Sequence, residues 1–160
     1  MKAVINSTPL ISLAIIDRLS LLDELFEEIY IPNAVFKETT RKGKRKASVI
    51  EKWGENRKAD VLDIKAKTAL GLIIDEGEAE VIVLAQEKDI GLVIIDEDKA
   101  RKVAKLNGLN VTGTIGILLD AKKQGKILQL KHSLDKLLTE GIYISEYLYD
   151  NALLLGKEKR

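Results

Sequence analysis

The sequence predicts an α/β protein in which helices cover both faces of a parallel sheet. Residues 3–5 and 92–95 are short, continuously apolar runs, as in strands that are buried on both faces. Longer segments with helical periodicity separate the apolar runs. This alternation favours a three-layer α/β/α arrangement with a parallel central sheet. Right-handed crossovers then place the carboxyl ends of all strands at one edge of the sheet.

Local signals place the individual elements. Thr8, with Pro9 after it, is expected to cap the first helix, and Asp75 and Asp96 are expected to cap two later helices. Strands are expected at residues 3–5, 29–31, 92–95 and 110–112. Helices are expected after Thr8, at 21–26, from Asn33, around Trp53, at 76–88, from Asp96, at 115–123 and as a pair within 131–156.

Length and composition predict one soluble domain. The chain has 160 residues, of which 46% are hydrophobic, so a single domain over 1–160 can bury a substantial core. The net charge is only +1, so any attraction to nucleic acid must come from local patches. Nothing at the start resembles a signal peptide, and no apolar run approaches the roughly 18–20 residues that span a bilayer. We therefore expect a cytoplasmic protein with no membrane partner.

The residue types that are absent exclude several kinds of chemistry. There is no cysteine and only one histidine, His132, which argues against thiolate chemistry, zinc sites and histidine-dependent triads. The dinucleotide fingerprint, the phosphate-binding P-loop and the Gly-x-Ser-x-Gly elbow are also absent. Carboxylates must therefore carry most of the chemistry.

Four polar side chains are predicted to converge at the carboxyl edge of the sheet. Asn6 and Asp96 directly follow buried strands, and Glu38 and Glu78 lie on nearby helices. An all-oxygen set of donors suits Mg²⁺ or Mn²⁺. Such an ion relieves repulsion among the carboxylates and positions a water molecule for attack on a phosphodiester.

Each of these residues also has a structural interpretation. Asp96 suits a helix cap, and Glu78 can complete a capping box with Asp75. Glu38 can be a solvated surface residue, and Asn6 can be a turn residue. Glu80 competes with Glu78 for the site, because residues two apart on a helix point in nearly opposite directions.

The spacing of five segments resembles a PIN-domain nuclease, in particular an uncharacterised prokaryotic branch related to VapC-type toxins. The segments are the opening strand and turn at 4–11, a Pro-x-x-Val-x-x-Glu helix at 31–38, the acidic helix start at 77–85, the strand end at 93–98 and the strand-to-helix turn at 111–116. The resemblance covers residues 3 to about 125.

The resemblance implies a cluster of acids that binds Mg²⁺ or Mn²⁺ and cuts single-stranded RNA. By position, Glu38, Glu78 and Asp96 are the implied catalytic acids and metal ligands, Asn6 is the remaining ligand, and Thr8 orients it. The basic residues that would bind RNA phosphates are Arg41, Lys44, Arg45, Lys99 and Arg101.

One position departs from the family pattern, because the first acid is replaced by Asn6. An amide oxygen can ligate Mg²⁺ but brings no charge, so metal affinity is expected to fall. The leading hypothesis is a metal-dependent endoribonuclease, as a homodimer and as the toxin of a toxin–antitoxin pair. The alternative is a weakened or inactive PIN fold that binds RNA or protein.

Overall fold

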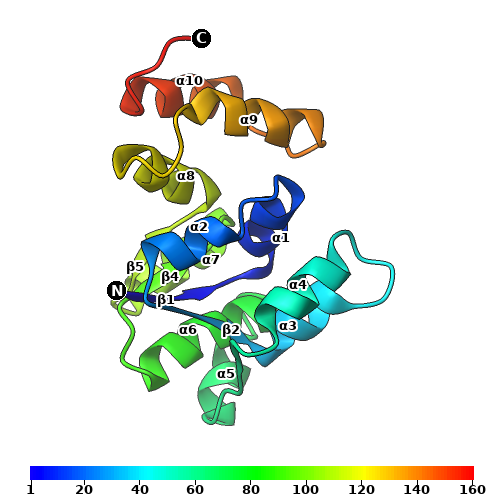
Figure 1. Ribbon diagram of the computed structural model, residues 1–160. Helices are drawn as coiled ribbons and strands as arrows, with labels where there is room; N and C mark the ends of the chain where they lie inside the picture. The colour runs from blue at the N-terminus through cyan, green and yellow to red at the C-terminus, as the bar shows by residue number, and fades with distance from the viewer.

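Five parallel strands form the central sheet of the computed structural model, which describes residues 1–160 (Figure 1). The strands lie in the order β3-β2-β1-β4-β5. Their bounds are β1 Lys2–Ile5, β2 Glu28–Pro32, β3 Lys58–Ala59, β4 Leu92–Ile94 and β5 Asn110–Thr112. The predicted parallel α/β/α fold class is confirmed.

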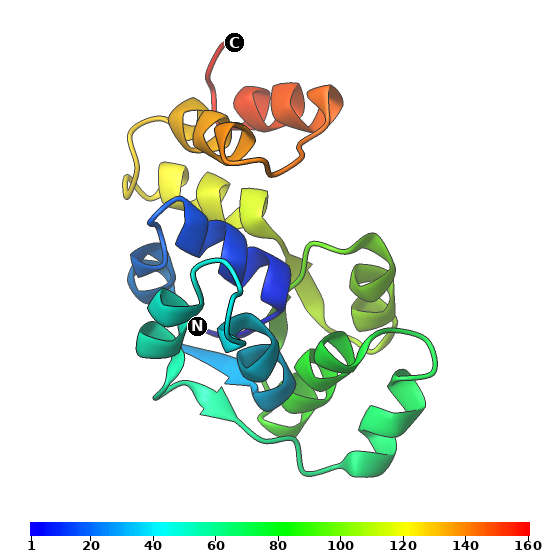
Figure 2. The ribbon, with the colours of Figure 1, turned by 90° about the vertical axis from the view of Figure 1, so that its right-hand side faces the viewer.

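Helices pack on both faces of this sheet. Their bounds are α1 Ser7–Ile15, α2 Ser20–Leu25, α3 Asn33–Thr40, α4 Ala47–Gly54, α5 Ile64–Leu70, α6 Glu76–Glu87, α7 Asp98–Leu106, α8 Thr114–Lys123, α9 Leu130–Thr139 and α10 Glu146–Leu155. Helix α6 crosses β1, β2 and β4, while α1, α2 and α8 lie on the other side of the sheet. Helices α9 and α10 add an outer layer over α8 (Figures 1 and 2).

The hydrophobic core explains why the strands are apolar on both faces. One cluster of 42 buried residues includes Ile5 of β1, Ile31 of β2 and Ile94 of β4, which are all fully buried. Every residue of α6 from 77 to 85 is also buried. A sheet sandwiched between helices has no solvated face, so its strands lack the polar alternation of an exposed sheet.

The sheet topology places a switch point at the carboxyl ends of β1 and β4. The connection from β1 leads to β2 on one side, whereas β4 and β5 lie on the other side. Ile5 is paired with Ile94, and the Asn6 N–H donates to the Ile94 carbonyl at 3.0 Å. Ligands of open α/β sheets bind at such a point.

Two predicted helix caps are wrong. Helix α1 begins at Ser7 with Asn6 in the cap position, so Thr8 lies inside the first turn. Helix α7 begins at Asp98 with Glu97 in the cap position, so Asp96 does not cap it. The cap predicted at Asp75 is confirmed.

The segment between α4 and α6 contains two elements that sequence periodicity did not predict. Strand β3 has only two residues, and α5 has no buried residue, so neither produces an apolar period. None of the helices combines the length and apolar character that a bilayer-spanning helix needs.

The carboxylate of Glu158, near the C-terminus, joins α8 to the start of α9. Glu158 accepts hydrogen bonds from the N–H groups of Leu130 and Lys131, at 2.6 and 3.0 Å, and from the Lys122 ammonium group. Burial alone would raise the pKa of Glu158, but these hydrogen bonds outweigh it and hold the pKa below its usual value. The charged form of Glu158 therefore stabilises the start of α9.

We predict that Glu158→Gln lowers the free energy of unfolding at neutral pH by about 1–3 kcal/mol, since hydrogen bonds to a charged group are lost. A lowered folded-state pKa gives stability that is complete above the usual glutamate value of about 4.3 and is lost as the pH falls through the folded value. The deficit of the variant should therefore shrink in acid. Denaturant unfolding at several pH values measures it. Glu146→Gln, at an 87% exposed side chain, is the control. A deficit that is the same at every pH would contradict the prediction.

Candidate functional site

Asn6 provides an amide at the floor of the switch point. The residue is only 6% exposed, and its side chain makes no hydrogen bond within the protein. No buried side-chain polar atom in the protein lacks a partner, so the Asn6 amide must reach solvent. Asn6 therefore has polar side-chain atoms at the carboxyl end of β1 that no other protein group uses.

Glu38 contacts Ser7, the residue that follows Asn6 in the chain. The hydroxyl of Ser7 donates to Oε2 of Glu38 at 3.0 Å, which links the start of α1 to α3. A Cβ atom on Gly77 would lie 3.6 Å from the same Oε2, so Glu38 also lies against the start of α6. Glu38 is half-buried, whereas Thr8 is exposed and its hydroxyl makes no hydrogen bond within the protein. The hydroxyl that orients an acid here is that of Ser7.

Glu78 lies at the start of α6, where it also stabilises the helix. Its N–H donates to the Asp75 carboxylate at 2.8 Å, and its own carboxylate accepts from the Asp75 N–H at 3.1 Å, which completes a capping box. Burial raises the pKa of Glu78, and the carboxylates of Asp75, Glu97 and Glu38 raise it further, against the lowering effect of the Asp75 N–H. Glu78 is therefore a buried acid with acidic neighbours and no cation beside it.

Glu80, the competing acid, is held by structural contacts. Its Oε1 accepts from the N–H of Ala34 at 2.9 Å, in the first turn of α3. Its Oε2 is paired with Lys67 of α5 at 2.7 Å, and Lys67 also contacts Glu76. Glu80 is 5% exposed, so these contacts compensate for burial of its charge. They tie α3, α5 and α6 together.

Asp96 is fixed by the turn that follows β5. Its Oδ1 accepts from the N–H of Thr114 at 2.7 Å, and its Oδ2 accepts from the Thr114 hydroxyl at 2.6 Å. A Cβ atom on Gly113 would lie 2.5 Å from Oδ1 of Asp96 and 2.9 Å from Nη1 of Arg101. Any larger residue at 113 would therefore force this carboxylate or this guanidinium to shift.

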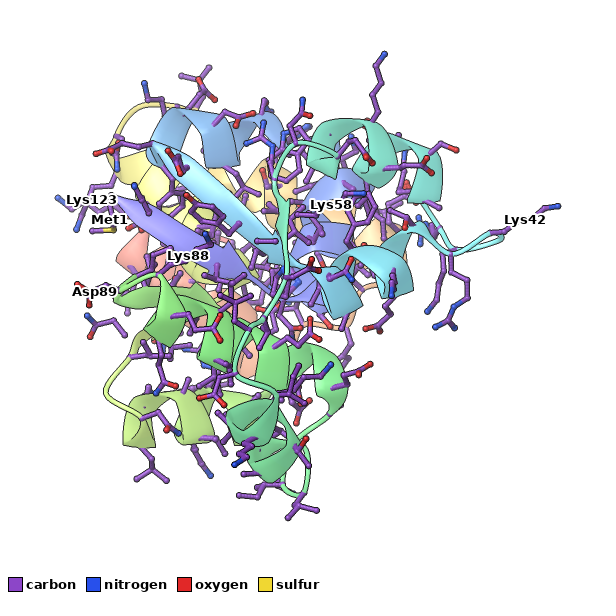
Figure 3. All side chains as sticks on the ribbon, turned by 90° about the horizontal axis from the view of Figure 1, so that it is seen from below. Met1, Lys42, Lys58, Lys88, Asp89 and Lys123 are labelled. Atoms are coloured by element: carbon purple, nitrogen blue, oxygen red, sulfur yellow. The ribbon has the colours of Figure 1, made fainter.

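The predicted RNA-binding residues fall into two groups. Arg41, Lys44 and Lys99 are exposed and pair with no protein group. Arg45 is held by Glu140, through bonds of 2.7 and 2.8 Å to its carboxylate and carbonyl. Arg101 is half-buried and donates to the Ile95 carbonyl at 2.8 Å, beside the turn that holds Asp96. Figure 3 shows Lys42, next to Arg41, at the tip of its loop and pointing away from the body.

Sequence reasoning missed three residues of this region. Ser7 and Thr114 bind the predicted acids Glu38 and Asp96, and Glu97 contributes a further charge near Glu78. Glu97 and Thr114 both lie in segments that resemble the family, at 93–98 and 111–116. Tertiary packing decides which side chains of these segments reach an acid, and the sequence does not show it. A Ser-Thr pair after the first strand likewise does not reveal which hydroxyl turns inward.

The donor chemistry of the site fits a hard divalent cation, since every group is an oxygen donor. A buried glutamate surrounded by three carboxylates also gains from a cation nearby. In the present arrangement, however, no three acidic or histidine side chains lie close enough to hold one ion. A cation shared by these acids would therefore require their side chains to shift closer together.

We predict that Glu80→Ala lowers the free energy of unfolding by about 1–3 kcal/mol, because it removes the acceptor of the Ala34 N–H and the closer of the two carboxylates paired with Lys67. Glu80→Gln should cost less, since its amide oxygen still accepts from Ala34. Denaturant unfolding measures both. Glu76→Gln removes the other partner of Lys67 at a 68% exposed side chain and should change stability by less than about 1 kcal/mol. Equal losses for Glu76→Gln and Glu80→Ala would contradict a structural role for Glu80.

Comparison with known families gives one match. The family described as DUF3368: PIN domain matches residues 2–158, almost the whole chain. Neither the curated proteins nor the solved structures include a significant match.

Proposed function

The chain belongs to the PIN-domain family, whose members are nucleases that act on nucleic acids and generally use divalent metal ions, and we propose that it is a metal-dependent endoribonuclease acting on single-stranded RNA. The observation that supports the proposal is that Glu38 and Glu97 act on the buried Glu78 at the edge of a parallel sheet where Asn6 and Asp96 follow β1 and β4. Mg²⁺ or Mn²⁺ is the proposed cofactor.

In this proposal Glu38, Glu78, Asp96 and the Asn6 amide hold the cation. A divalent cation in such a site supplies Lewis-acid stabilisation and a bound water of lowered pKa. Ser7 orients Glu38, and Thr114 orients Asp96 through two hydrogen bonds. Arg101, fixed by the Ile95 carbonyl, has guanidinium donors left for a phosphate oxygen. Cleavage leaves a 5′-phosphate and a 3′-hydroxyl.

The unpaired cations Arg41, Lys44 and Lys99 are proposed to bind RNA phosphates, and Arg45 joins them only by leaving Glu140. A homodimer and a cognate antitoxin belong to the same proposal. Tyr147, Leu148 and Leu154 of α10 are exposed and offer apolar surface to another chain, whereas Leu153 is buried. We propose that residues 1–160 act as a single domain.

A second candidate function is supported by Asn6 itself. A neutral residue where a charged metal ligand is expected, in a structure with no group of three acids that could hold a metal ion, favours a PIN fold that binds RNA or protein without cutting. A binding module should retain RNA in the presence of a chelator, whereas cleavage requires the cation. Metal dependence therefore separates the two functions.

We predict Mn²⁺-dependent cleavage of a labelled single-stranded RNA that Asp96→Asn lowers by at least about 100-fold, since changing even an outer partner of a metal ligand typically costs 10–100-fold. The variant should fold normally, because an amide can still accept from the Thr114 N–H and donate to its hydroxyl. Asp120→Asn, at an exposed residue of α8, is the matched control. Cleavage that persists in Asp96→Asn or in a chelator would refute the proposed mechanism. A wild-type protein that binds the RNA equally with and without chelator and does not cut it would favour the binding module.

We predict that Asn6→Asp strengthens Mn²⁺ binding by at least about tenfold, because two unit charges about 4 Å apart interact by about 4 kcal/mol at an effective dielectric constant of 20. Calorimetric titration with Mn²⁺ measures this. Asn110→Asp makes the same charge change at an exposed residue that begins β5, and should leave the affinity unchanged. Equal effects of the two substitutions would show that net charge, not the Asn6 position, controls binding.

A further inference from the structure

A cavity of about 540 Å³ lies beside the only tryptophan of the chain, Trp53. It is open to solvent and is lined by residues of α4, of the end of α1 and of the turn that leads into α2. Helices α1 and α4 pack against each other. The apolar walls of the cavity are Trp53, Ala14, Leu19 and Val49. The predicted acidic site does not use any of these residues.

The indole ring of Trp53 is held in one orientation. Its Nε1–H donates to Oδ2 of Asp23 at 3.1 Å, and the Arg57 guanidinium lies 3.9 Å from the ring centroid. Arg57 is fixed in turn by Asp23 at 2.7 Å and by the Trp53 carbonyl at 2.9 Å. Arg57 lines a separate cavity on Trp53 and not the larger one. The Trp53 side chain that lines the larger cavity is therefore held in one orientation, and the guanidinium stacked on it does not line that cavity.

A second cavity, of about 430 Å³, adjoins the first, and Val49 lines both. Lys42, Lys44 and Lys46 line it, against a single acid, Glu51. Lys42 and Lys44 have no ion-pair partner. The one acid of the first cavity, Asp17, is neutralised by Lys46 at 3.7 Å and Lys136 at 3.5 Å. A cationic cavity thus adjoins an apolar, aromatic one.

We propose that these two cavities bind a single-stranded nucleic acid, with one base stacked on Trp53 and the flanking phosphates at Lys42 and Lys44. Stacking on an aromatic ring combined with cationic groups along the backbone is how proteins bind single strands without reading their sequence. The charge complementarity of the lysine cavity favours this polyanion over an apolar peptide.

The position of the two cavities relates them to the acidic site. Lys42 and Lys44 lie on the loop that begins one turn after Glu38, at the end of α3. A strand held there therefore contacts a loop that is close in sequence to Glu38. The choice of RNA as the ligand rests on the proposed function, whereas the location of the subsite does not.

Trp53 fluorescence tests the subsite directly, because no other tryptophan contributes. The probe is a short single-stranded RNA with 2′-O-methyl groups, titrated in a chelator so that neither cleavage nor metal is involved. We expect saturable quenching of the fluorescence, and no comparable quenching by the same RNA as a duplex, whose bases are already stacked. An unchanged signal while anisotropy reports binding of labelled RNA would overturn the proposal.

Variants then separate the two cavities. Trp53→Leu should weaken binding of the labelled probe by about tenfold or more, with a smaller loss for Trp53→Phe, which keeps an aromatic ring. Val49→Asp adds a negative charge to the shared wall at a residue that is 47% exposed, so its effect on binding does not depend on a core change. Lys42→Gln with Lys44→Gln should weaken binding and flatten its salt dependence, while Lys105→Gln on α7 should do neither.

The outcomes distinguish this proposal from the nuclease proposal. Loss of probe binding in Trp53→Leu and Val49→Asp, in a protein that never cuts RNA, would support the subsite and refute the nuclease. Unchanged probe binding in both variants, in a protein that does cut RNA, would refute the subsite alone. A Trp53 signal that changes with protein concentration and not with RNA would assign the cavity to a second copy of the chain and overturn the proposal.

Discussion

The pairing of β1 with β4 is the constraint on which the site depends. β1 lies in the middle of the sheet and is hydrogen-bonded to β2 on one side and to β4 on the other. After β1 the chain continues toward β2, and after β4 it continues toward β5 on the other side of the sheet. A crevice that can bind a ligand forms at such a switch point, outside the carboxyl ends of the strands. Asn6 and Asp96 lie there because they are the first polar residues after those strands. Helices α3 and α6 then bring Glu38 and Glu78 to the same edge.

The two buried glutamates of α6 show how a structural acid differs from a candidate ligand. Glu80 is compensated by a cation, Lys67, and by the Ala34 N–H, so its charge is satisfied inside the protein. Glu78 has one backbone donor from the capping box, and its other charged neighbours are carboxylates, which together with burial raise its pKa. Burying an uncompensated charge costs free energy, and a bound cation would offset that cost. The asymmetry between Glu78 and Glu80 is therefore a physical argument for ligand binding at Glu78.

The sequence predicted the fold well where burial dictates residue type. Continuous apolar runs located β1, β2 and β4, and the Asp75-x-x-Glu78 spacing located the start of α6. Prediction failed for β3 and α5, whose residues are too exposed to show a period. It also failed at Asp96, whose carboxylate binds Thr114 instead of capping α7. A sequence shows that an acid is available but not which distant N–H or hydroxyl will reach it.

The replacement of an acid by Asn6 has two opposing consequences. Without a cation, a neutral side chain here spares the buried Glu78 and the half-buried Glu38 one more repulsive charge, which favours the metal-free protein. With a cation, the same neutrality removes attraction where it would be strongest. Asn6 therefore makes the metal-free protein more stable and the metal-bound protein less stable than an acid would. Metal affinity falls as a result, even though every donor is still an oxygen. A strand that binds Lys42, Lys44 and Trp53 and also extends to the acidic site would bring its own phosphate oxygens there. Because phosphates are ligands that Mg²⁺ prefers, substrate can supply the charge that Asn6 lacks. Metal binding and nucleic-acid binding are thereby expected to reinforce each other, each being weak alone.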